Sequence, residues 1–385
     1  HNKYQISGGE DSVLEQEMNL LRYNSHEVFL YTLSNKSIKN IFHKIWTLLN
    51  VHYSYSSKNN ISKFIQKVKP DIVHVHNFFP LITPSVFDAC IDGSVPIVQT
   101  LHNFRLICPS ALLMHNNKIY EKSIHKNAFS TVFDKVYKNS YLGTFAVARM
   151  IEYHKKNKTW KTKVDKFIAL TNFSKSKFVE FGLPKNKISI KPNFLAKEVF
   201  FNSKQIDRSG ALFVGRLSEE KGLKILLNSW DKSSINLKII GGGPLENLVK
   251  KNKNKNIQYL GFLDKNEIYK EMQEASFLVF PSIWYEGFPM VIIESFSNGL
   301  PIIASNLGSM SEIIKDNHNG LHFKTGDTKD LIEKVNLLST DKKLCTTMSI
   351  NAINDFKNLY TDKINYKLLI QIYEKVINDK KSKNS

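Results

Sequence analysis

The sequence predicts an α/β fold in which two doubly wound domains face each other across a cleft. Short apolar runs alternate with longer amphipathic stretches along almost the whole chain, which is typical of βα units around parallel sheets. The length of 385 residues suits two domains, since a domain usually has roughly 100–200 residues. A polar stretch at residues 193–209 separates the two series of βα units. We therefore expect domains at residues 1–195 and 196–360, followed by a helix and tail at 361–385.

The composition is that of an ordinary globular protein. Apolar residues make up 42% and charged residues 23% of the chain, which excludes a disordered or fibrous protein. No apolar run is long enough to predict a membrane-spanning helix. Cys90, Cys108 and Cys345 lie far apart, so they predict neither a disulfide framework nor a zinc cluster. Such cysteine usage suits a reducing compartment and predicts a cytoplasmic protein.

The charge of the chain is strongly positive. Lys and Arg number 54 against 35 Asp and Glu, and residues 118–197 alone hold 18 basic and five acidic side chains. This excess suits an anionic partner such as a nucleic acid, a lipid surface or a phosphorylated substrate, but a general bias toward Lys, Asn and Ile explains it equally well. Only five of the 54 basic residues are Arg and no recognition motif is present, which argues against nucleic-acid binding.

Four apolar runs predict the strands of the first domain. They are residues 26–33, 71–78, 95–102 and 166–171. The chain begins on the polar segment 1–11, which contains a glycine turn, whereas a doubly wound domain has a buried strand just before such a turn. We therefore expect the first strand of this domain to be missing.

Five further runs predict the strands of the second domain: residues 210–217, 235–243, 257–261, 276–282 and 300–305. Helical patterns fill the gaps, among them Ser12–Tyr23, Gly222–Trp230, Lys265–Glu274 and Met290–Asn298. A last helix at about 361–379 is expected to pack back across the domain junction, with a disordered tail after it.

Residues 281–305 carry the strongest functional signal. They follow a buried strand, and a turn of Glu286, Gly287, Phe288 and Pro289 leads into a helix that begins near Met290. Proline suits the first turn of a helix. The N–H groups of Phe288, Met290 and Val291 are then free to bind an anion or sugar hydroxyls.

Two carboxylates of this segment are candidate sugar ligands. Glu294 lies eight residues after Glu286 and can accept hydrogen bonds from two vicinal hydroxyls of a ribose. Glu286 would point at the sugar of a donor. Glutamates at this spacing are commonly just solvated, but their place after a buried strand favours binding.

Residues 213–223 predict a diphosphate site. A strand ends at Gly215, a helix begins near Gly222, and Arg216 and Lys221 lie between them. Arg216 can bind a phosphate through two donors and Lys221 adds a point charge beside the helix N-terminus. The alternative is that both cations are solvated and paired with the neighbouring glutamates.

Two glycine turns extend this pattern. Gly8 and Gly9 precede the first helix and let the backbone approach a phosphate. The glycines within 239–248 lack the G-x-G-x-x-G spacing and predict a tight turn that borders the donor site.

Three polar side chains are expected at the ends of adjacent strands of the first domain: His76, Asn77 and His102. His102 is the candidate to hydrogen-bond a substrate hydroxyl or to stabilise a developing positive charge. His74 is expected to be structural. The sequence contains no Ser-His-Asp order, H-E-x-x-H, Walker loop or Asp-x-Asp motif, so metal catalysis is not expected.

Together these motifs resemble retaining glycosyltransferases of family 4, which have the GT-B fold of two Rossmann-like domains. The similar segments span Gly8 to about Phe323 and include "GGEDSVLEQEMNLL", "DIVHVHNFFPLITPSVF", "FVGRLSEEKGL" and the Glu-x7-Glu block. The segment "HNFRLICPSALL" resembles a bacterial subgroup that builds cell-surface polysaccharide. The cysteine that often follows in that subgroup is absent from residues 115–127.

The resemblance implies transfer of a sugar from a nucleotide diphosphate sugar, such as a UDP- or GDP-sugar, to a glycan or lipid-linked acceptor, with no metal or other cofactor. Arg216, Lys221 and the Gly9 N–H would neutralise the leaving diphosphate, and Glu294 would hold the ribose. Glu286 and the backbone of Phe288–Met290 would hold the donor sugar.

The same resemblance assigns the remaining candidates. His102 would contact the donor sugar near the reacting carbon, Leu263 would frame the base, and His76 and Asn77 would lie on the acceptor side. A GT-B enzyme of different chemistry, such as a nucleotide-sugar epimerase or a phosphorylase, is the alternative, as is an inactive binding homologue.

Residues 152–167 suggest a membrane partner. They interleave lysines with Tyr153, Trp160 and Phe167, a pattern that suits an anionic bilayer surface. We therefore expect peripheral attachment at the inner face of the plasma membrane through this segment.

Overall fold

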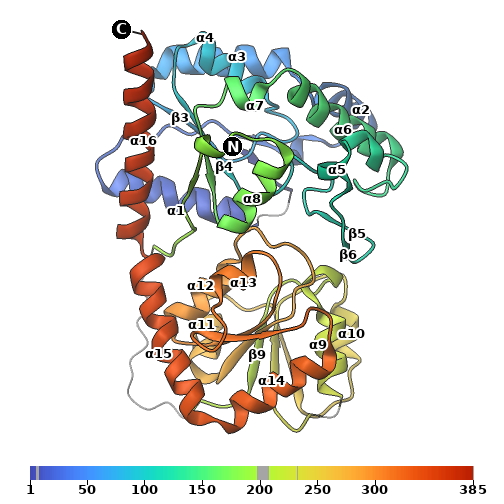
Figure 1. The fold of residues 1–385 in the computed structure, drawn as a ribbon. Helices are drawn as coiled ribbons and strands as arrows, with labels where there is room; N and C mark the ends of the chain where they lie inside the picture. Colours follow the sequence, from blue (N-terminus) through green and yellow to red (C-terminus); the bar gives the residue numbers. More distant parts are fainter. Residues whose placement is uncertain (6–7, 197–207, 232, 385) are drawn as a thin grey trace. The chain divides into compact units, whose positions relative to one another are not determined.

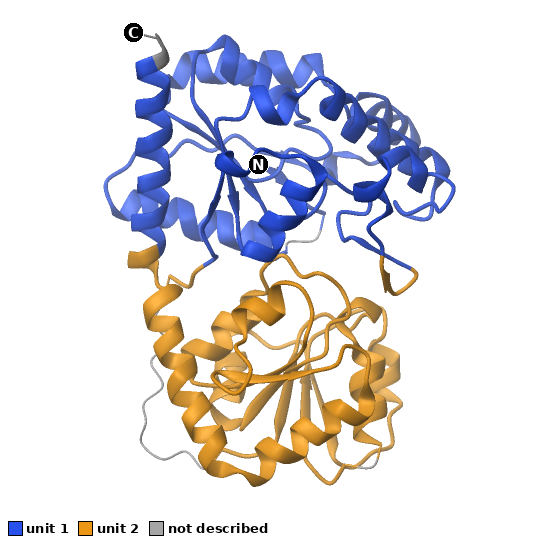
Figure 2. Cartoon of the chain, viewed as in Figure 1, with its two compact units in different colours: residues 1–115, 120–193, 365–385 blue, residues 116–119, 194–364 orange. Residues whose placement is uncertain are grey.

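The structure, a computed structural model, describes residues 1–5, 8–196, 208–231 and 233–384 (Figure 1). The chain divides into two compact units (Figure 2). The first unit consists of residues 1–115, 120–193 and 365–385, and the second of residues 116–119 and 194–364. The chain thus passes from one unit to the other between Asn193 and Phe194, within the stretch 193–209 expected to separate the domains, of which residues 197–207 lie outside the described residues.

The first unit contains a parallel sheet of four strands. Its order is β3 (Val73–Val75), β4 (Ile97–Leu101), β7 (Lys166–Ala169) and β8 (Ile188–Ile190). A separate parallel pair consists of β1 (Asn2–Lys3) and β2 (Leu33–Ser34). The Asn2 N–H donates to the Asn77 carbonyl oxygen at 2.8 Å, just after β3, so β1 runs beside the end of β3. The strand order at this edge is therefore β2, β1, β3.

Asn2 and Lys3 form strand β1, where the sequence pattern predicts no strand. Asn2 is fully buried, and its side chain bonds the Asn35 side chain at 2.8 Å and the Leu81 N–H at 3.0 Å. Because these bonds satisfy a polar residue inside the strand, the apolar pattern that marks the other strands is absent here. The strand predicted at 26–33 is also shorter than expected: only Leu33 belongs to β2, and Phe29 and Leu30 are exposed.

The helices of the first unit lie between and after these strands. They are α1 (Gly9–Tyr23), α2 (Ile41–Asn50), α3 (Tyr55–Val68), α4 (Ser85–Asp92), α5 (Lys122–His125), α6 (Tyr141–Lys156), α7 (Thr159–Thr162), α8 (Asn172–Phe181) and α16 (Asp362–Asn384). Two-residue strands β5 (Met114–His115) and β6 (Lys118–Ile119) form a hairpin.

The last helix completes the core of the first unit. Leu369, Tyr373 and Val376 of α16 pack against Val98 of β4 and Ile168 of β7. The segment after residue 379, expected to be disordered, continues this helix to Asn384. No helix within the described residues is both long and apolar enough to cross a membrane.

The second unit contains six parallel strands. Their order is β11 (Ile257–Gly261), β10 (Leu237–Ile240), β9 (Ala211–Val214), β12 (Phe277–Phe280), β13 (Ile302–Ser305) and β14 (Gly320–Phe323). Counted along the chain this order is 3-2-1-4-5-6, that of a doubly wound sheet. The direction of winding reverses between β9 and β12, and a ligand crevice is expected at their carboxyl ends.

Seven helices described in this unit connect its strands and follow them. They are α9 (Leu223–Trp230), α10 (Glu246–Lys250), α11 (Lys265–Glu274), α12 (Met290–Ser297), α13 (Ser309–Ile313), α14 (Thr328–Thr340) and α15 (Lys342–Leu359). The fully buried Trp230 packs in a core with Phe213 and Phe277 from the two central strands. This core holds the ends of β9 and β12 in fixed register.

A glycine forms the contact between the loops that follow these two strands. Gly222, with φ of 71°, precedes α9, and a Cβ placed on it would lie 1.9 Å from the Pro281 carbonyl oxygen. Gly261 has a similar φ of 75° but nothing within 4 Å of such a Cβ. A side chain at Gly261 would therefore meet backbone strain alone, whereas a side chain at Gly222 would meet both strain and steric overlap.

Replacement of each glycine by alanine tests this contact. Gly261→Ala should lower the free energy of unfolding by about 1–2 kcal/mol, the cost of a left-handed conformation. Gly222→Ala should cost at least about 2 kcal/mol more, because backbone atoms must move to relieve the overlap. Urea unfolding measures both, and equal losses would contradict the close approach at Pro281.

Candidate active site

The candidate site of the second unit lies where the sheet winding reverses. One loop follows β9 and contains Arg216 and Lys221, and the other follows β12 and contains Glu286. A glycine turn after β10 packs against the first loop: a Cβ on Gly241 would lie 2.0 Å from the Gly215 carbonyl oxygen. The turn at residues 241–243 therefore supports the loop by backbone contact.

Glu286 is the most constrained carboxylate of this site. Its side chain is buried, and three donors converge on Oε1: Lys221 Nζ at 2.6 Å, Ser282 Oγ at 2.7 Å and Trp284 Nε1 at 2.8 Å. The other oxygen, Oε2, has no donor among the described residues. Glu286 is thus held in one orientation by one oxygen and offers the second to a ligand hydroxyl.

Next to Glu286 the backbone presents unpaired donors. Helix α12 begins at Met290, as predicted. Pro289 is its N-cap residue and precedes the first helical turn. In the described part of the chain, no hydrogen-bond acceptor faces the N–H groups of Gly287, Phe288, Met290 and Val291. Such groups at a helix N-terminus bind anions or hydroxyl oxygens.

Arg216 follows β9 and Leu263 follows β11, two strands that β10 separates in the sheet. Arg216 is exposed and has neither an ion pair nor a hydrogen bond to any residue that the structure describes. Its guanidinium can bind a diphosphate in a bidentate manner. Leu263 follows β11, is half-buried, and its backbone N–H has no acceptor within the described ranges.

Glu294 has a different environment from Glu286. It lies in α12 with most of its side chain buried, and the nearest cation, Lys265 Nζ, is 3.9 Å from its Oε1. Burial raises the pKa of the Glu294 carboxyl, and Lys265 offsets this only in part. Without a close donor, the carboxylate is available for the hydroxyls of a ligand.

In the first unit the candidates follow β1, β3 and β4. Gly9 is the first residue of α1, and its N–H has no acceptor in the described chain. His76 and Asn77 follow β3, and His102 follows β4. The Asn77 side chain bonds backbone groups, donating to the Asn2 carbonyl oxygen at 2.8 Å and accepting from the Phe79 N–H at 2.9 Å, so it secures this turn.

Short polar contacts join the two histidines to a carboxylate. His102 Nε2 lies 3.0 Å from His76 Nδ1, and His76 Nε2 lies 3.3 Å from Glu17 Oε2. Burial lowers the pKa of His102 well below its usual range, so the ring is neutral. A neutral imidazole has one donor and one acceptor nitrogen, so His102 can hydrogen-bond a substrate hydroxyl.

Glu17 and Lys191 are the pair that the sequence did not reveal. Lys191, fully buried, bonds Glu17 Oε1 and lies 3.2 Å from Asn365 Oδ1. Burial opposes ionisation of Glu17, but the Lys191 ammonium and the His76 ring hold its pKa well below the usual range. His74, expected to be structural, bonds Tyr373 OH and Thr100 Oγ1, each at 2.7 Å.

Glu10 is a second unpredicted carboxyl, next to Gly9. Its Oε2 lies 3.2 Å from Tyr4 OH and 3.3 Å from Asn103 Nδ2. Burial raises the pKa of Glu10 to about 8. The only sequence sign was its place directly after the glycine turn, since a charged residue in the first turn of a helix is ordinarily solvated.

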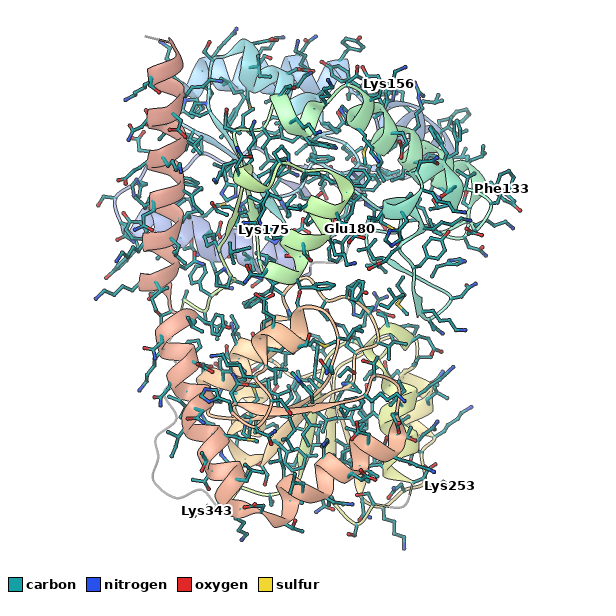
Figure 3. All side chains as sticks on the ribbon, in the orientation of Figure 1. Phe133, Lys156, Lys175, Glu180, Lys253 and Lys343 are labelled. Atoms are coloured by element: carbon teal, nitrogen blue, oxygen red, sulfur yellow. The ribbon has the colours of Figure 1, made fainter. Side chains whose placement is uncertain are left out.

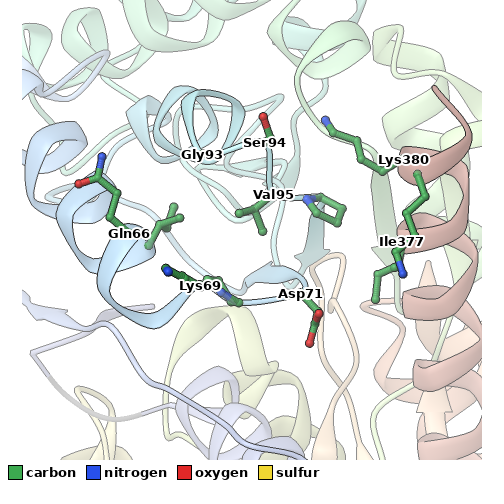
Figure 4. Close-up of a pocket in the computed structure, with 12 residues that line it drawn as sticks. Gln66, Lys69, Asp71, Gly93, Ser94, Val95, Ile377 and Lys380 are labelled. Carbon is green, nitrogen blue, oxygen red and sulfur yellow. The ribbon is translucent and has the colours of Figure 1, made fainter. Parts of the chain in front are cut away.

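Two cavities lie at the amino ends of the strands, away from the candidate site. The first, of about 530 Å³, is lined by residues around Lys69, Asp71, Val95 and Lys380 (Figure 4), at the amino ends of β3 and β4. The second, of about 590 Å³, lies at the amino ends of β9, β10 and β11. Ligands of doubly wound sheets bind at the carboxyl ends, so neither cavity is the candidate active site.

The segment 152–167 does not present the predicted aromatic face to a membrane. Trp160 is 3% exposed and Phe167 is 0% exposed, because Trp160 packs on Phe78 and Phe87 and Phe167 belongs to β7. Tyr153 remains exposed, as do lysines of the segment such as Lys156 (Figure 3). The expectation of membrane attachment through these aromatic side chains is therefore wrong.

Comparison with known proteins agrees with this arrangement. The family model "Glycosyltransferase Family 4" matches residues 6–198, half of the chain, and the model "Glycosyl transferases group 1" matches residues 197–355. The chain belongs to glycosyltransferase family 4. The fold is GT-B, with two Rossmann-like domains, as the sequence predicts.

Individual relatives of this glycosyltransferase cover most or half of the chain. An uncharacterized glycosyltransferase of Methanocaldococcus jannaschii is 29% identical over 87% of this chain and 84% of its own length. The N,N'-diacetylbacillosaminyl-diphospho-undecaprenol alpha-1,3-N-acetylgalactosaminyltransferase of Campylobacter jejuni is 30% identical over 47% of this chain and 49% of its own. The structure of Anabaena HepE in complex with UDP has a TM-score of 0.66 at 15% identity, covering 97% of this chain and 98% of HepE, and shows the shared fold.

The raised pKa of Glu10 predicts a pH-dependent contribution to stability. A carboxyl whose pKa is raised in the folded state stabilises at low pH and loses this contribution as the pH rises through the folded value. The difference in unfolding free energy between the wild type and Glu10→Gln should therefore fall by about 1.4 kcal/mol per pH unit from about pH 5 to about pH 8. Denaturant unfolding across this range measures it, and a constant difference would contradict the assignment.

The buried pair Glu17–Lys191 predicts a strong coupling. Glu17→Gln leaves the Lys191 ammonium without its counter-charge and should lower the free energy of unfolding by about 3–5 kcal/mol. The double variant Glu17→Gln, Lys191→Met should lose clearly less than the sum of the two single variants. The exposed pair Glu246–Lys250 is the control, and Glu246→Gln should leave stability almost unchanged. Additive losses at the buried pair would overturn the coupling.

Proposed function

We propose that this glycosyltransferase moves a sugar from a nucleotide diphosphate sugar, most simply a UDP-sugar, to a glycan or lipid-linked acceptor in polysaccharide synthesis. The observation that supports this donor is the environment of Glu286. One of its oxygens is locked by Lys221, Ser282 and Trp284, the other is open, and unpaired N–H groups follow it directly.

Each part of a nucleotide diphosphate sugar has a partner of suitable chemistry in the second unit. Arg216 and Lys221 offer positive charge to the diphosphate, and Glu294 offers a carboxylate to the two ribose hydroxyls. Glu286 Oε2 and the N–H groups of residues 287–290 are proposed to bind the hydroxyls of the sugar. Leu263 would contact the base through its backbone.

The proposed reaction retains the anomeric configuration. The bond between the anomeric carbon and the diphosphate oxygen breaks, and its electron pair goes to the diphosphate, whose charge Arg216 and Lys221 stabilise. The acceptor hydroxyl forms its bond to the same face of that carbon and gives its proton to the departing phosphate oxygen. In the first unit the proposed substrate ligands are the Gly9 N–H and His102.

The acceptor proposal draws on the relatives. The Campylobacter jejuni enzyme is named for a diphospho-undecaprenol acceptor, and HepE binds UDP. We therefore propose a lipid-linked acceptor, with His76 on its side of the site, and a reaction at the inner face of the plasma membrane. Cys90, Cys108 and Cys345 form no disulfide with one another.

We further propose that the reaction needs no metal. In the second unit the charge of the diphosphate is balanced by Arg216 and Lys221. In the first unit, Glu17, His74 and His76 bring three possible metal ligands together, but Glu17 already binds the buried Lys191 ammonium. A nucleotide diphosphate should therefore bind equally well with EDTA present.

Thermal unfolding with UDP, GDP, ADP and CMP in EDTA tests the donor site. One nucleoside diphosphate should raise the melting temperature, because it binds only the folded state. Arg216→Ala and Glu294→Gln should each weaken its binding about 10- to 100-fold, the value of a hydrogen bond to a charged group. Arg22→Ala, which removes an exposed arginine of α1, is the control and should bind as the wild type does.

Glu294→Gln should also separate binding from stability. Because burial raises the pKa of Glu294, its ionised form costs folding free energy at neutral pH, and the neutral amide removes this cost. The ligand-free variant should therefore melt at a higher temperature than the wild type while gaining less from the nucleotide. If no nucleotide shifts the wild type, or if Glu294→Gln binds normally, the assignment of the donor site fails.

A further inference from the structure

The large apolar side chains of helix α2 are exposed to solvent instead of being packed in the core. Ile41, Phe42, Ile45, Trp46 and Leu49 are all exposed, with Phe42 at 76% and Trp46 at 49%. At 100° per residue these five positions fall on one face of the helix. Thr47, on the opposite face, is 7% exposed and its hydroxyl donates to the His43 carbonyl oxygen. We call the five exposed side chains the α2 face.

A second apolar surface lies on the neighbouring helix. Tyr141, Leu142 and Phe145 of α6 are exposed on one face, and the ring of Phe129 lies 5.7 Å from that of Phe145. We call these four residues the α6 face. Phe133, which precedes α6, projects from the ribbon and is 84% exposed (Figure 3).

The two faces belong to one rigid part of the first unit. Arg149, on the same side of α6 as Phe145, lies 3.3 Å from the ring of His52, which follows α2. The carbonyl oxygen of His52 lies 2.7 Å from His154 Nε2, and the His52 ring packs edge-on against Tyr153. These contacts fix the end of α2 against α6. An exposed apolar area of this extent on a folded unit marks an interaction surface.

The charge around the two faces identifies the partner. Residues 28–70 contain seven lysines and no Asp or Glu. Residues 135–151 contain Lys135, Lys138 and Arg149 and likewise no acidic residue. Exposed aromatic and aliphatic side chains on lysine-rich segments suit the interface of an anionic bilayer, where the apolar groups enter the headgroup region and lysines meet the lipid phosphates. A second copy of this chain would bring like charges together.

We propose that the α2 face and the α6 face dock this enzyme on an anionic lipid bilayer. The inference rests on the proposed function in one respect: a lipid-linked acceptor gives the enzyme a reason to bind a membrane. Lipid docking needs neither donor nor acceptor, so it can be measured independently of nucleotide binding. It also replaces the segment 152–167 as the membrane surface with side chains that are in fact exposed.

Vesicle sedimentation of the full chain tests the proposal. The wild type should bind vesicles of phosphatidylcholine with phosphatidylglycerol and bind phosphatidylcholine alone far more weakly. The variant Phe42→Ser, Trp46→Ser should lose about tenfold or more in affinity for the mixed vesicles, because two aromatic anchors are removed. The matched control Leu337→Ser, Ile350→Ser removes two exposed apolar side chains of the second unit and should bind as the wild type does.

Fluorescence provides a readout that needs no destabilising substitution. Of the four tryptophans, Trp46 is exposed, Trp160 and Trp230 are buried, and Trp284 of the second unit is half-buried. Emission of the wild type should shift to shorter wavelength on mixed vesicles and be quenched by brominated lipid chains. The Trp46→Phe variant should show neither effect but should still sediment with the vesicles.

The outcomes separate the alternatives. Absence of wild-type binding, equal binding by the α2-face variant, or an unquenched Trp46 would each overturn the proposal. So would a wild-type dimer that the Phe42→Ser, Trp46→Ser variant abolishes, since the α2 face would then bind a second copy. Normal stabilisation of that variant by the nucleoside diphosphate shows that its loss of lipid binding leaves the donor site intact. A failed nucleotide shift with intact vesicle binding would count against the proposed function alone.

Discussion

Two neighbouring parallel strands whose following segments leave toward opposite faces of a sheet cannot cover their own carboxyl ends. A ligand crevice is expected where the winding reverses in this way, and the candidate site of this glycosyltransferase is arranged around it. In the second unit it lies between β9 and β12, and the loops from these strands supply Arg216, Lys221 and Glu286. In the first unit, Gly9 follows β1 and His76 follows β3.

The carboxylates of the molecule show how environment divides their roles. Glu286 is paired with a lysine and held by two further donors, so it can orient a ligand without moving. Glu294 is buried without a close donor, which favours a hydroxyl ligand as its missing partner. Glu17 is paired with a buried lysine and acts on His102 only through the ring of His76. The carboxylate of Glu286 is thus held in one orientation, that of Glu294 is open to a ligand, and that of Glu17 positions a histidine.

Most of the fold could be predicted because its strands are buried on both faces and read as continuous apolar runs. The strands from β9 to β13 and helix α11 lie where the pattern placed them. Strand β1 could not be found in this way, since Asn2 is satisfied by long-range hydrogen bonds that leave no periodic signal. The residues of the second unit were predictable because glycine, proline and charge fall together within short segments. Glu10, Glu17 and Lys191 were not, because their effect comes from partners distant in the sequence or from burial.

Helix α16 has a consequence for the life of the chain in the cell. Its side chains fill the core beside β4 and β7, yet it is translated after the whole second unit. Domains generally fold from the N-terminus as they emerge from the ribosome. The first unit would therefore expose part of its hydrophobic core until α16 has been synthesised. A product cut short by only two dozen residues would keep a complete second unit and an incomplete first one. Chains without α16 would therefore present this surface to chaperones and proteases.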